Sequence, residues 1–573
     1  MPHKAHLFSL SLGHAFYDAC IKEKYSFKRF GQDLLAGISV GIIAIPLAMA
    51  LAIASGVPPQ YGLYTAIIGG FIISLTGGSR YSISGPTAAF VVLLYPIAQE
   101  FGLAGLLMAT AMSGVILVMM SLLKLGQLIQ YIPEPVTLGF TGGIGVVIAT
   151  LQLKDFFGLS IADMPEHYID KLAALAHALP TIEAASTSVA LATFAVMLMW
   201  PKLKTPIPAH LPAIIVGSFL ALWLNQDGTI VETIGTRFSY PLADGGVGMG
   251  IPPFMPAFEL PWLQDGPNHQ ALGFSWSMVQ ALLPSAFAIA MLGAIESLLC
   301  AVVLDGMTGK RHSANSELLG QGLGNIIAPF FGGIPATAAI ARSAANVKAG
   351  AQSPVAGMVH SIVLLLGLLL LANILAYLPM PAMAALLLVV AWNMSEAPKA
   401  LHLIKSAPKS DVIVFLTCFS LTVIFDMVIA ITVGIVLAAL LFMKEIAEMT
   451  RLYNITQNKR YIDRDIPDNW LVLKINGPLF FAAADSIFSE ITLLAKEHQT
   501  LILYMDGVSI LDAGGLTALT KLIEHLQAKQ CKLVITDLQF QPIRTLARAK
   551  IQPIEDLLHF YPTLGDALEK HPH

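Results

Sequence analysis

The sequence predicts a polytopic α-helical membrane protein followed by a separate soluble domain. Of its 573 residues, 55% are hydrophobic and 12% are charged, whereas soluble proteins carry about 25% charged residues. Residues 444–573 hold 30 of the 70 charged residues, or 23% of that stretch, while residues 1–443 hold 40, or 9%. This composition excludes a soluble enzyme of several ordinary domains, and also a collagen-like, disordered or disulfide-stapled chain.

Apolar runs recur throughout residues 31–443. A helix that crosses the bilayer needs about 20 apolar residues. Clear runs fall at 34–55, 61–76, 103–123, 136–153, 184–200, 211–224, 278–304, 355–376, 381–393, 411–425 and 427–443. Three shorter, glycine-rich runs fall at 84–98, 318–331 and 336–347. Together they predict about fourteen transmembrane helices.

Basic residues in short loops predict which side of the membrane each loop occupies. Lys22, Lys24, Lys28 and Arg29 precede the first run and place residues 1–30 in the cytoplasm. An even number of spans returns the C-terminal domain to the same side. No cleavable signal peptide is expected, because the first residues carry charges and lack an apolar stretch beside a cleavage site.

Two short segments at matching places in the two halves cannot be ordinary helix interior. Residues 77–87 contain glycines and a Gly-Pro pair, and residues 332–343 contain a Gly-Gly pair and a proline; each precedes a helical pattern. Such paired interruptions at membrane depth indicate a transporter site. If the halves are inverted repeats, two short helices begin near the midplane with converging N-termini, each carrying roughly +0.5 charge. The pattern predicts an anion site, and a kinked helix is the alternative for the first segment alone.

Two ionisable residues lie inside the apolar body, where a charge costs about 2.5–3.5 kcal/mol on insertion scales. Arg342 adds a positive charge beside the second short helix, which favours an anion. Glu296 lies well inside its apolar run, and we expect it to bind a proton or sodium ion as the anion arrives. An apolar site favours the neutral carboxyl, and therefore the proton. The alternatives are a structural hydrogen bond from Glu296 and a static ion pair with Arg342.

The sequence indicates no metal, cofactor or nucleic-acid site. A net charge of −4 and a pI near 6.4 give no basic excess for binding nucleic acid. The four cysteines lack the spacing of metal ligands. No nucleophile–base pair stands out among the motifs, so a membrane-embedded enzyme is not supported.

Several motifs in the right order resemble the sulfate permease family of anion transporters. They are residues 46–52 (Pro-Leu-Ala-Met-Ala-Leu-Ala), 59–64 (Pro-Gln-Tyr-Gly-Leu-Tyr), 84–87 (Ser-Gly-Pro-Thr), 296–297 (Glu-Ser) and 341–346 (Ala-Arg-Ser-Ala-Ala-Asn). The likeness extends over almost the whole chain. Within the family, the sequence is most similar to that of a bacterial C4-dicarboxylate transporter at residues 41–46, 291–309 and 391–396.

This resemblance implies fourteen helices in two inverted seven-helix repeats, divided into a core and a gate domain as in the UraA-like fold. It also implies a homodimer in the inner membrane of a bacterial cell. The anion is expected between the third and tenth helices, with the first and eighth as walls. By correspondence the substrate-binding residues are Leu47, Leu51, Gly85, Pro86, Thr87, Ala341, Arg342 and Ser343, and the proton-coupling residue is Glu296. Leu47 is apolar where some animal members carry a polar residue, which favours an organic anion.

Residues 470–573 are predicted to form a cytosolic α/β domain after a linker at 444–469. Strand patterns at 470–475, 501–505 and 532–536 alternate with helical patterns at 486–497 and 515–529. Residues 511–516 resemble the motif loop of the STAS domain, which sulfate transporters share with anti-sigma-factor antagonists. Ala513 stands where those antagonists carry a phosphorylated serine. Without that hydroxyl the phosphorylation switch cannot operate there, so we expect a role in dimerisation or regulation.

The leading prediction is a secondary transporter that takes up C4-dicarboxylates, such as succinate, fumarate or aspartate, together with protons. A second hypothesis is sodium-coupled or exchange transport of bicarbonate, sulfate or chloride. A third is a signalling scaffold that has lost transport and acts through its C-terminal domain. For the transporters, the expected partners are a small anion, a coupling ion and the lipid bilayer.

Overall fold

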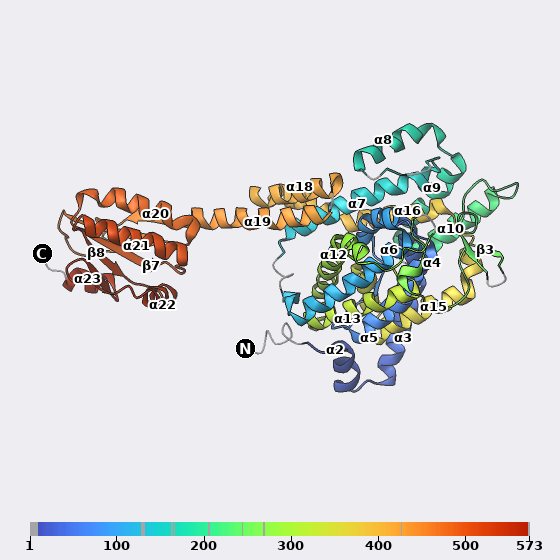
Figure 1. Cartoon of the computed structure of the whole chain (residues 1–573), viewed down its shortest axis with the longest axis horizontal. Helices are drawn as coiled ribbons and strands as arrows, with labels where there is room; N and C mark the ends of the chain where they lie inside the picture. Colours follow the sequence, from blue (N-terminus) through green and yellow to red (C-terminus); the bar gives the residue numbers. More distant parts are fainter. Residues whose placement is uncertain are drawn as a thin grey trace. The chain divides into compact units, whose positions relative to one another are not determined.

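The chain forms two compact units, Met1–Ile435 and Val436–His573. The computed structural model describes residues 10–127, 132–161, 164–165, 167–203, 205, 207–242, 245–267, 270–425 and 427–570. Figure 1 follows the chain through both units. Each unit is described by itself.

The first unit is almost entirely helical (Figure 1). Its longer helices are α3 (Phe27–Ala54), α6 (Ala88–Leu122), α7 (Glu134–Phe157), α9 (Ala184–Met199), α10 (His210–Leu224), α12 (Trp276–Thr308), α13 (Ala314–Ile327), α15 (Val355–Leu375), α16 (Met380–Ser395), α18 (Lys409–Ile424) and α19 (Met427–Met449), the last of which continues into the second unit. Shorter helices are α2 (His14–Phe16), α4 (Pro59–Tyr64), α5 (Gly70–Thr76), α8 (Tyr168–Ala178), α11 (Ile234–Arg237), α14 (Ile340–Lys348) and α17 (Ala397–Ser406).

The apolar runs of the sequence form helices of different length and regularity. In the described part of the chain, eight helices are long and apolar enough to cross a membrane. Other helices are shorter. Helices α4 and α5 form one continuous segment, because a π-helical turn at Thr65–Gly69 joins them. Helix α6 contains two segments, because Gly102 interrupts it with a φ of 65°, a conformation that glycine adopts readily.

Two very short strands from the two halves of the sequence pair at the centre of the first unit. Strand β1 (Ser84–Gly85) precedes α6, and β4 (Thr337–Ala338) precedes α14. They pair antiparallel, with Ser84 opposite Ala338 and Gly85 opposite Thr337. Because the strands run in opposite directions, the helices that follow them also leave the pair in opposite directions. This is the geometry expected of two inverted repeats.

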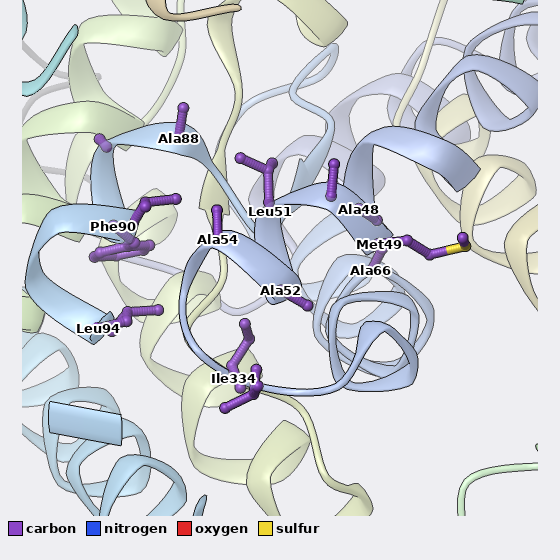
Figure 2. Packing of buried hydrophobic residues seen from close by; sticks show 14 of the residues in the cluster. Ala48, Met49, Leu51, Ala52, Ala54, Ala66, Ala88, Phe90, Leu94 and Ile334 are labelled. Carbon is purple, nitrogen blue, oxygen red and sulfur yellow. The ribbon is translucent and has the colours of Figure 1, made fainter. Parts of the chain in front are cut away.

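A continuous apolar core surrounds the strand pair. Figure 2 shows the part where Ala48 and Leu51 of α3 lie near Ala88 and Phe90 of α6. Small residues allow close helix packing in this core. A Cβ added to Gly62 would lie only 2.0 Å from the carbonyl oxygen of Ala48. Helix α3 is therefore held tightly beside α4.

The second unit contains a five-stranded sheet with the strand order β5-β6-β7-β8-β9 (Figure 1). Its strands are β5 (Arg451–Asn454), β6 (Trp470–Asn476), β7 (Thr500–Gly507), β8 (Lys532–Thr536) and β9 (Leu558–Tyr561). Its helices are α20 (Phe481–Leu494), α21 (Ala513–Ala528), α22 (Phe540–Arg548) and α23 (Leu564–Lys570). One face of the sheet packs against α20, α21 and α22, and the other against α23 and residues 455–466.

The predicted strands are confirmed as β6, β7 and β8, and the predicted helices as α20 and α21. The stretch 444–469, predicted as a linker, instead contains the end of α19 and strand β5. Strand β5 belongs to the sheet because it pairs antiparallel with β6, with Leu452 opposite Ile475. Helix α21 begins at Ala513, directly after Asp512, whose carboxylate accepts the Gly515 N–H at 2.8 Å.

Candidate functional site

The backbone before β1 fits against the start of α13 only because of its glycines. Gly77 ends α5, and Gly78 continues the chain toward β1. A Cβ on Gly78 would lie 2.2 Å from the carbonyl oxygen of Ser313. Glu317 of α13 then accepts the N–H groups of Gly78 at 2.9 Å and Ser79 at 2.8 Å. This buried carboxylate fixes the loop that directs β1 and α6.

The helices that follow the two strands both begin without a side-chain cap. The N-cap residue is Thr87 in α6 and Ala339 in α14, and neither side chain accepts a hydrogen bond from the first turn of its helix. The first N–H groups of a helix have no partner within the helix, and they carry its partial positive charge. Because β1 and β4 pair with each other, both N-termini lie at the same junction. Each can receive an anion.

The side chain of Arg342, on α14 in the second half of the chain, reaches the backbone of the first half. Its side chain is buried, at 4% exposure, and Nη2 donates to the carbonyl oxygen of Pro86 at 2.5 Å. A Cβ on Gly85 would lie 3.1 Å from Nη1, so the guanidinium passes directly beside β1. Nη1 and Nε have no hydrogen-bond partner among the described residues. The charge therefore lies between the starts of α6 and α14, with two buried donor nitrogens left unpaired.

The neighbours of Arg342 differ in their access to a ligand. Ser343 is buried, and its Oγ accepts the N–H of Ile83 at 2.9 Å, so it holds the backbone before β1. Ala341 is exposed in the first turn of α14. A ligand at this N-terminus would therefore meet Ala341 and not Ser343.

The Glu296 side chain of α12 forms a hydrogen bond with the N-cap residue of α6. The Oγ1 of Thr87 donates to Oε2 of Glu296 at 2.9 Å, which explains why this hydroxyl does not cap α6. Glu296 is partly exposed, whereas Thr87 is buried. The static ion pair considered for Glu296 and Arg342 is not formed, since the hydrogen bonds described for the two side chains go to Thr87 and Pro86. Glu296 and Arg342 thus act on the junction from separate positions.

Helix α3 contributes apolar surface near this junction. Pro46 lies inside α3 and removes one backbone N–H from its hydrogen-bond ladder. Leu47 is partly exposed and packs at the edge of the core, whereas Leu51 is 2% exposed within it (Figure 2). Of the two leucines predicted to line the site, Leu47 is the one with surface left for a ligand.

A stripe of polar side chains on α13 was missed by the sequence analysis. Glu317, Gln321 and Asn325 are all buried and lie four residues apart, hence on one face of the helix. Gln321 Nε2 donates to Ser84 Oγ at 3.2 Å. The amide of Asn325 donates to the Ala336 carbonyl at 3.0 Å and accepts its N–H at 2.8 Å. The stripe thus fixes both strands, and its four-residue spacing is the signal that could have revealed it.

Comparison with known proteins decides the family. Residues 30–418 match the Sulfate permease family, and residues 461–567 match the STAS domain. The chain belongs to the sulfate permease family. YvdB of Bacillus subtilis, named as a provisional sulfate transporter, is 38% identical over 94% of this chain and 97% of that protein. The bicarbonate transporter BicA of a Picosynechococcus species is 27% identical over 93% of each chain.

Solved structures show the same architecture. The murine Solute Carrier 26 family member A9 anion transporter, in its inward-facing state, aligns with a TM-score of 0.82 at 19% identity, covering 99% of this chain and 94% of that chain. The transmembrane domain of a cyanobacterial BicA aligns with a TM-score of 0.60 at 27% identity, covering 72% and 98%. The predicted fold is confirmed: a polytopic helical membrane protein with a C-terminal STAS domain. The protein is an anion transporter of this family and not an enzyme.

Proposed function

We propose that this protein is a secondary transporter that carries a C4-dicarboxylate together with a proton. The observation that supports this most directly is the pair of uncapped helix N-termini beside Arg342, with Glu296 next to one of them. Backbone N–H groups and a guanidinium are the donors that hold a carboxylate strongly. Glu296 is partly exposed and Ala341 is exposed, so such a ligand would meet both residues at the two N-termini.

Glu296 would couple anion binding to a proton through electrostatic repulsion. An ionised Glu296 repels an anion bound at the N-terminus of α6, and the repulsion is strong where water is scarce. Protonation removes this repulsion, so each ligand strengthens the binding of the other. An inward proton gradient would then accumulate the anion. A sodium ion at Glu296 would neutralise the same charge, which makes sodium coupling the alternative.

The proposed substrate rests on the apolar wall and on the sequence resemblance. Leu47 provides apolar surface for the carbon chain of an organic anion. The resemblance of residues 291–309 and 391–396 to the C4-dicarboxylate transporter DauA suggests succinate, fumarate or aspartate. We further propose a homodimer in a bacterial inner membrane, with both termini in the cytoplasm.

A second candidate function is sodium-coupled or exchange transport of sulfate, bicarbonate or chloride. The names of two relatives favour it, since YvdB is named for sulfate and BicA for bicarbonate. These inorganic anions would bind the same helix N-termini. They differ from a dicarboxylate in having no carbon chain to contact Leu47.

Uptake into proteoliposomes tests the proposal. Labelled succinate should accumulate when the outside is acidic, and unlabelled fumarate should compete better than sulfate, bicarbonate or chloride. Uptake of sulfate or bicarbonate that follows sodium and ignores pH would establish the second candidate instead. If no anion were transported while the protein remained folded, a scaffold role acting through the STAS domain would replace both.

A further inference from the structure

A large apolar groove opens on the surface of the first unit, and none of its lining residues belongs to the anion site. It is lined by α7, α9, α16, α17 and α18, and its volume is about 920 Å³, within the roughly 300–1,000 Å³ of sites that bind small molecules. Several apolar side chains on its walls are exposed: Leu198 at 54%, Trp392 at 65% and Leu416 at 47%. The groove therefore opens toward the hydrocarbon region.

Small residues make the floor of the groove deep. Gly142, Gly145, Val146 and Ala149 of α7 lie along it, one or two turns apart. A Cβ on Gly145 would lie 2.8 Å from the carbonyl oxygen of Ala391 in α16, so α7 and α16 are in close contact there. The small residues leave space above α7 that an acyl chain can occupy.

One end of the groove is bounded by α17, which is amphipathic. This helix follows a sharp turn at Glu396, whose φ is 43°. The α17 residues that line the groove are Ala397, Ala400, Leu401 and Ile404. Its Lys399 and His402 line a different depression together with Asp411. A short helix with one apolar and one basic side is typical of the membrane interface, and the exposed Trp392 has the same preference.

Positive charge lies at this end of the groove. Lys405 follows the groove-lining Ile404 and is one turn beyond Leu401 on α17, so its long aliphatic stem can reach the edge of the groove. Lys409 begins α18, whose Phe415 and Leu416 form part of the wall. Neither lysine belongs to an ion pair in the described part of the chain, whereas Lys399 pairs with Glu396. An apolar groove that ends beside two available ammonium groups is complementary to an apolar chain with an anionic head.

We propose that the groove binds an acyl chain of an anionic phospholipid, whose headgroup is held by Lys405 and Lys409. The acyl chain fills the groove, but bulk lipid tails are equally apolar, so the chain alone does not select one lipid over another. The lysines select lipids with an anionic headgroup. Attraction near a membrane surface should favour the anionic headgroup roughly fivefold per lysine. The site depends on the membrane location of the chain and not on which anion is transported.

Trp392 supplies a direct readout for this site. The full-length protein is reconstituted into vesicles that contain phospholipid with brominated acyl chains, which quench nearby tryptophan fluorescence. Of the six tryptophans, the contribution of Trp392 is obtained by difference from Trp392→Phe. Brominated phosphatidylglycerol should quench this contribution at a severalfold lower mole fraction than brominated phosphatidylcholine.

Variants separate the headgroup contact from the acyl-chain contact. Combined Lys405→Gln and Lys409→Gln should abolish the preference for phosphatidylglycerol, while Lys202→Gln, at another exposed lysine, should retain it. Ala149→Phe should fill the groove and reduce quenching by both lipids. Leu191→Phe, at an exposed residue of α9 outside the groove, should not.

Two results would overturn the proposal. Equal quenching by the two lipids, or a preference that survives the double lysine change, would show that no headgroup is selected. Absence of quenching by both lipids, with Ala149→Phe converting a dimer to a monomer in native mass spectrometry, would show that a second copy of the chain occupies the groove.

Discussion

The two helices that begin at the strand pair both start at an extended N-cap residue without a side-chain cap, but their side chains differ. Helix α6 begins at Thr87, whose hydroxyl bonds to the titratable Glu296. Helix α14 begins at Ala339, which has no polar side chain, and its Arg342 donates to Pro86 of the other half. The helix from the first half is therefore linked to a titratable carboxyl group on α12, and the helix from the second half carries a fixed positive charge. The two helices are alike in offering an N-terminus that can bind an anion. The side chains beside the two N-termini give each of them a different role.

Removing the fixed charge should have the largest effect. Arg342→Ala takes away a buried guanidinium and leaves the Pro86 carbonyl unpaired. Truncating one partner of a buried charged interaction costs about 2–5 kcal/mol, so anion affinity should fall at least about 30-fold. Isothermal titration of the purified protein with the anion measures this fall in affinity.

Arg342→Lys controls for folding in that experiment. It keeps the charge but loses the fork of donors, so it should retain the native unfolding temperature and part of the affinity. Wild-type affinity in Arg342→Ala would mean that the second half supplies no charge to the ligand.

Replacing the titratable group should uncouple transport without abolishing binding. Glu296→Gln keeps a side chain that can bond to Thr87 but cannot ionise. Gradient-driven accumulation in proteoliposomes should disappear, while anion exchange at neutral pH stays within about threefold of wild type. Accumulation that still follows the pH gradient in Glu296→Gln would place the coupling proton elsewhere.

Adding a cap to the second helix should weaken the anion site by a smaller amount. Ala339 has the extended backbone of an N-cap residue, so Ala339→Ser should bond to a first-turn N–H and stabilise α14 by about 0.5–2 kcal/mol. That donor would be lost to the ligand, and affinity should fall several-fold while the unfolding temperature rises. Ala339→Cys is nearly isosteric but accepts hydrogen bonds weakly, so it should behave like wild type. Equal affinity for all three proteins would show that the anion does not use this N-terminus.

The smallest predicted effect concerns a carboxylate near the N-terminus that links the two halves. Glu23 accepts hydrogen bonds from Arg80, before β1, at 2.8 Å and from Lys310, after α12, at 3.2 Å. Burial raises the pKa of Glu23, but these bonds outweigh it and lower the pKa to about 2, from 4.5. Its contribution to stability is therefore complete above pH 4.5 and is lost as the pH falls from there through about 2.

Thermal unfolding across pH tests this contribution. Because about a third of the Glu23 side chain is exposed, we expect the pairs to add no more than about 1 kcal/mol. Glu23→Gln should lower the unfolding temperature at pH 7, and the difference from wild type should shrink below pH 4.5. A difference that stays constant down to pH 3 would assign the effect to packing and not to charge.

Much of the fold and part of the site could be predicted from local sequence features. Long apolar runs predicted the helices of the membrane unit, and glycine and proline at residues 77–87 and 332–343 located the irregular backbone. The alternation of apolar residues predicted β6, β7 and β8. These features depend on residues close together in the chain, which is why sequence patterns reveal them.

Contacts between distant residues could not be predicted in the same way. That Arg342 donates to Pro86, 256 residues earlier, depends on how the two halves pack. Strand β5 carries too short a pattern to stand out from a linker, and it is defined by its pairing with β6. The polar stripe of α13 was visible as a four-residue spacing, but its targets at Ser84 and Ala336 were not.

The central claim is that anion binding between the two short helices is linked to protonation of Glu296. Isothermal titration of the anion in two buffers with different ionisation enthalpies measures the protons taken up per anion bound. We predict an uptake approaching one proton in the wild-type protein as the pH rises, and none in Glu296→Gln. Anion binding without proton uptake in the wild type at any pH, or an unchanged uptake in Glu296→Gln, would contradict the account.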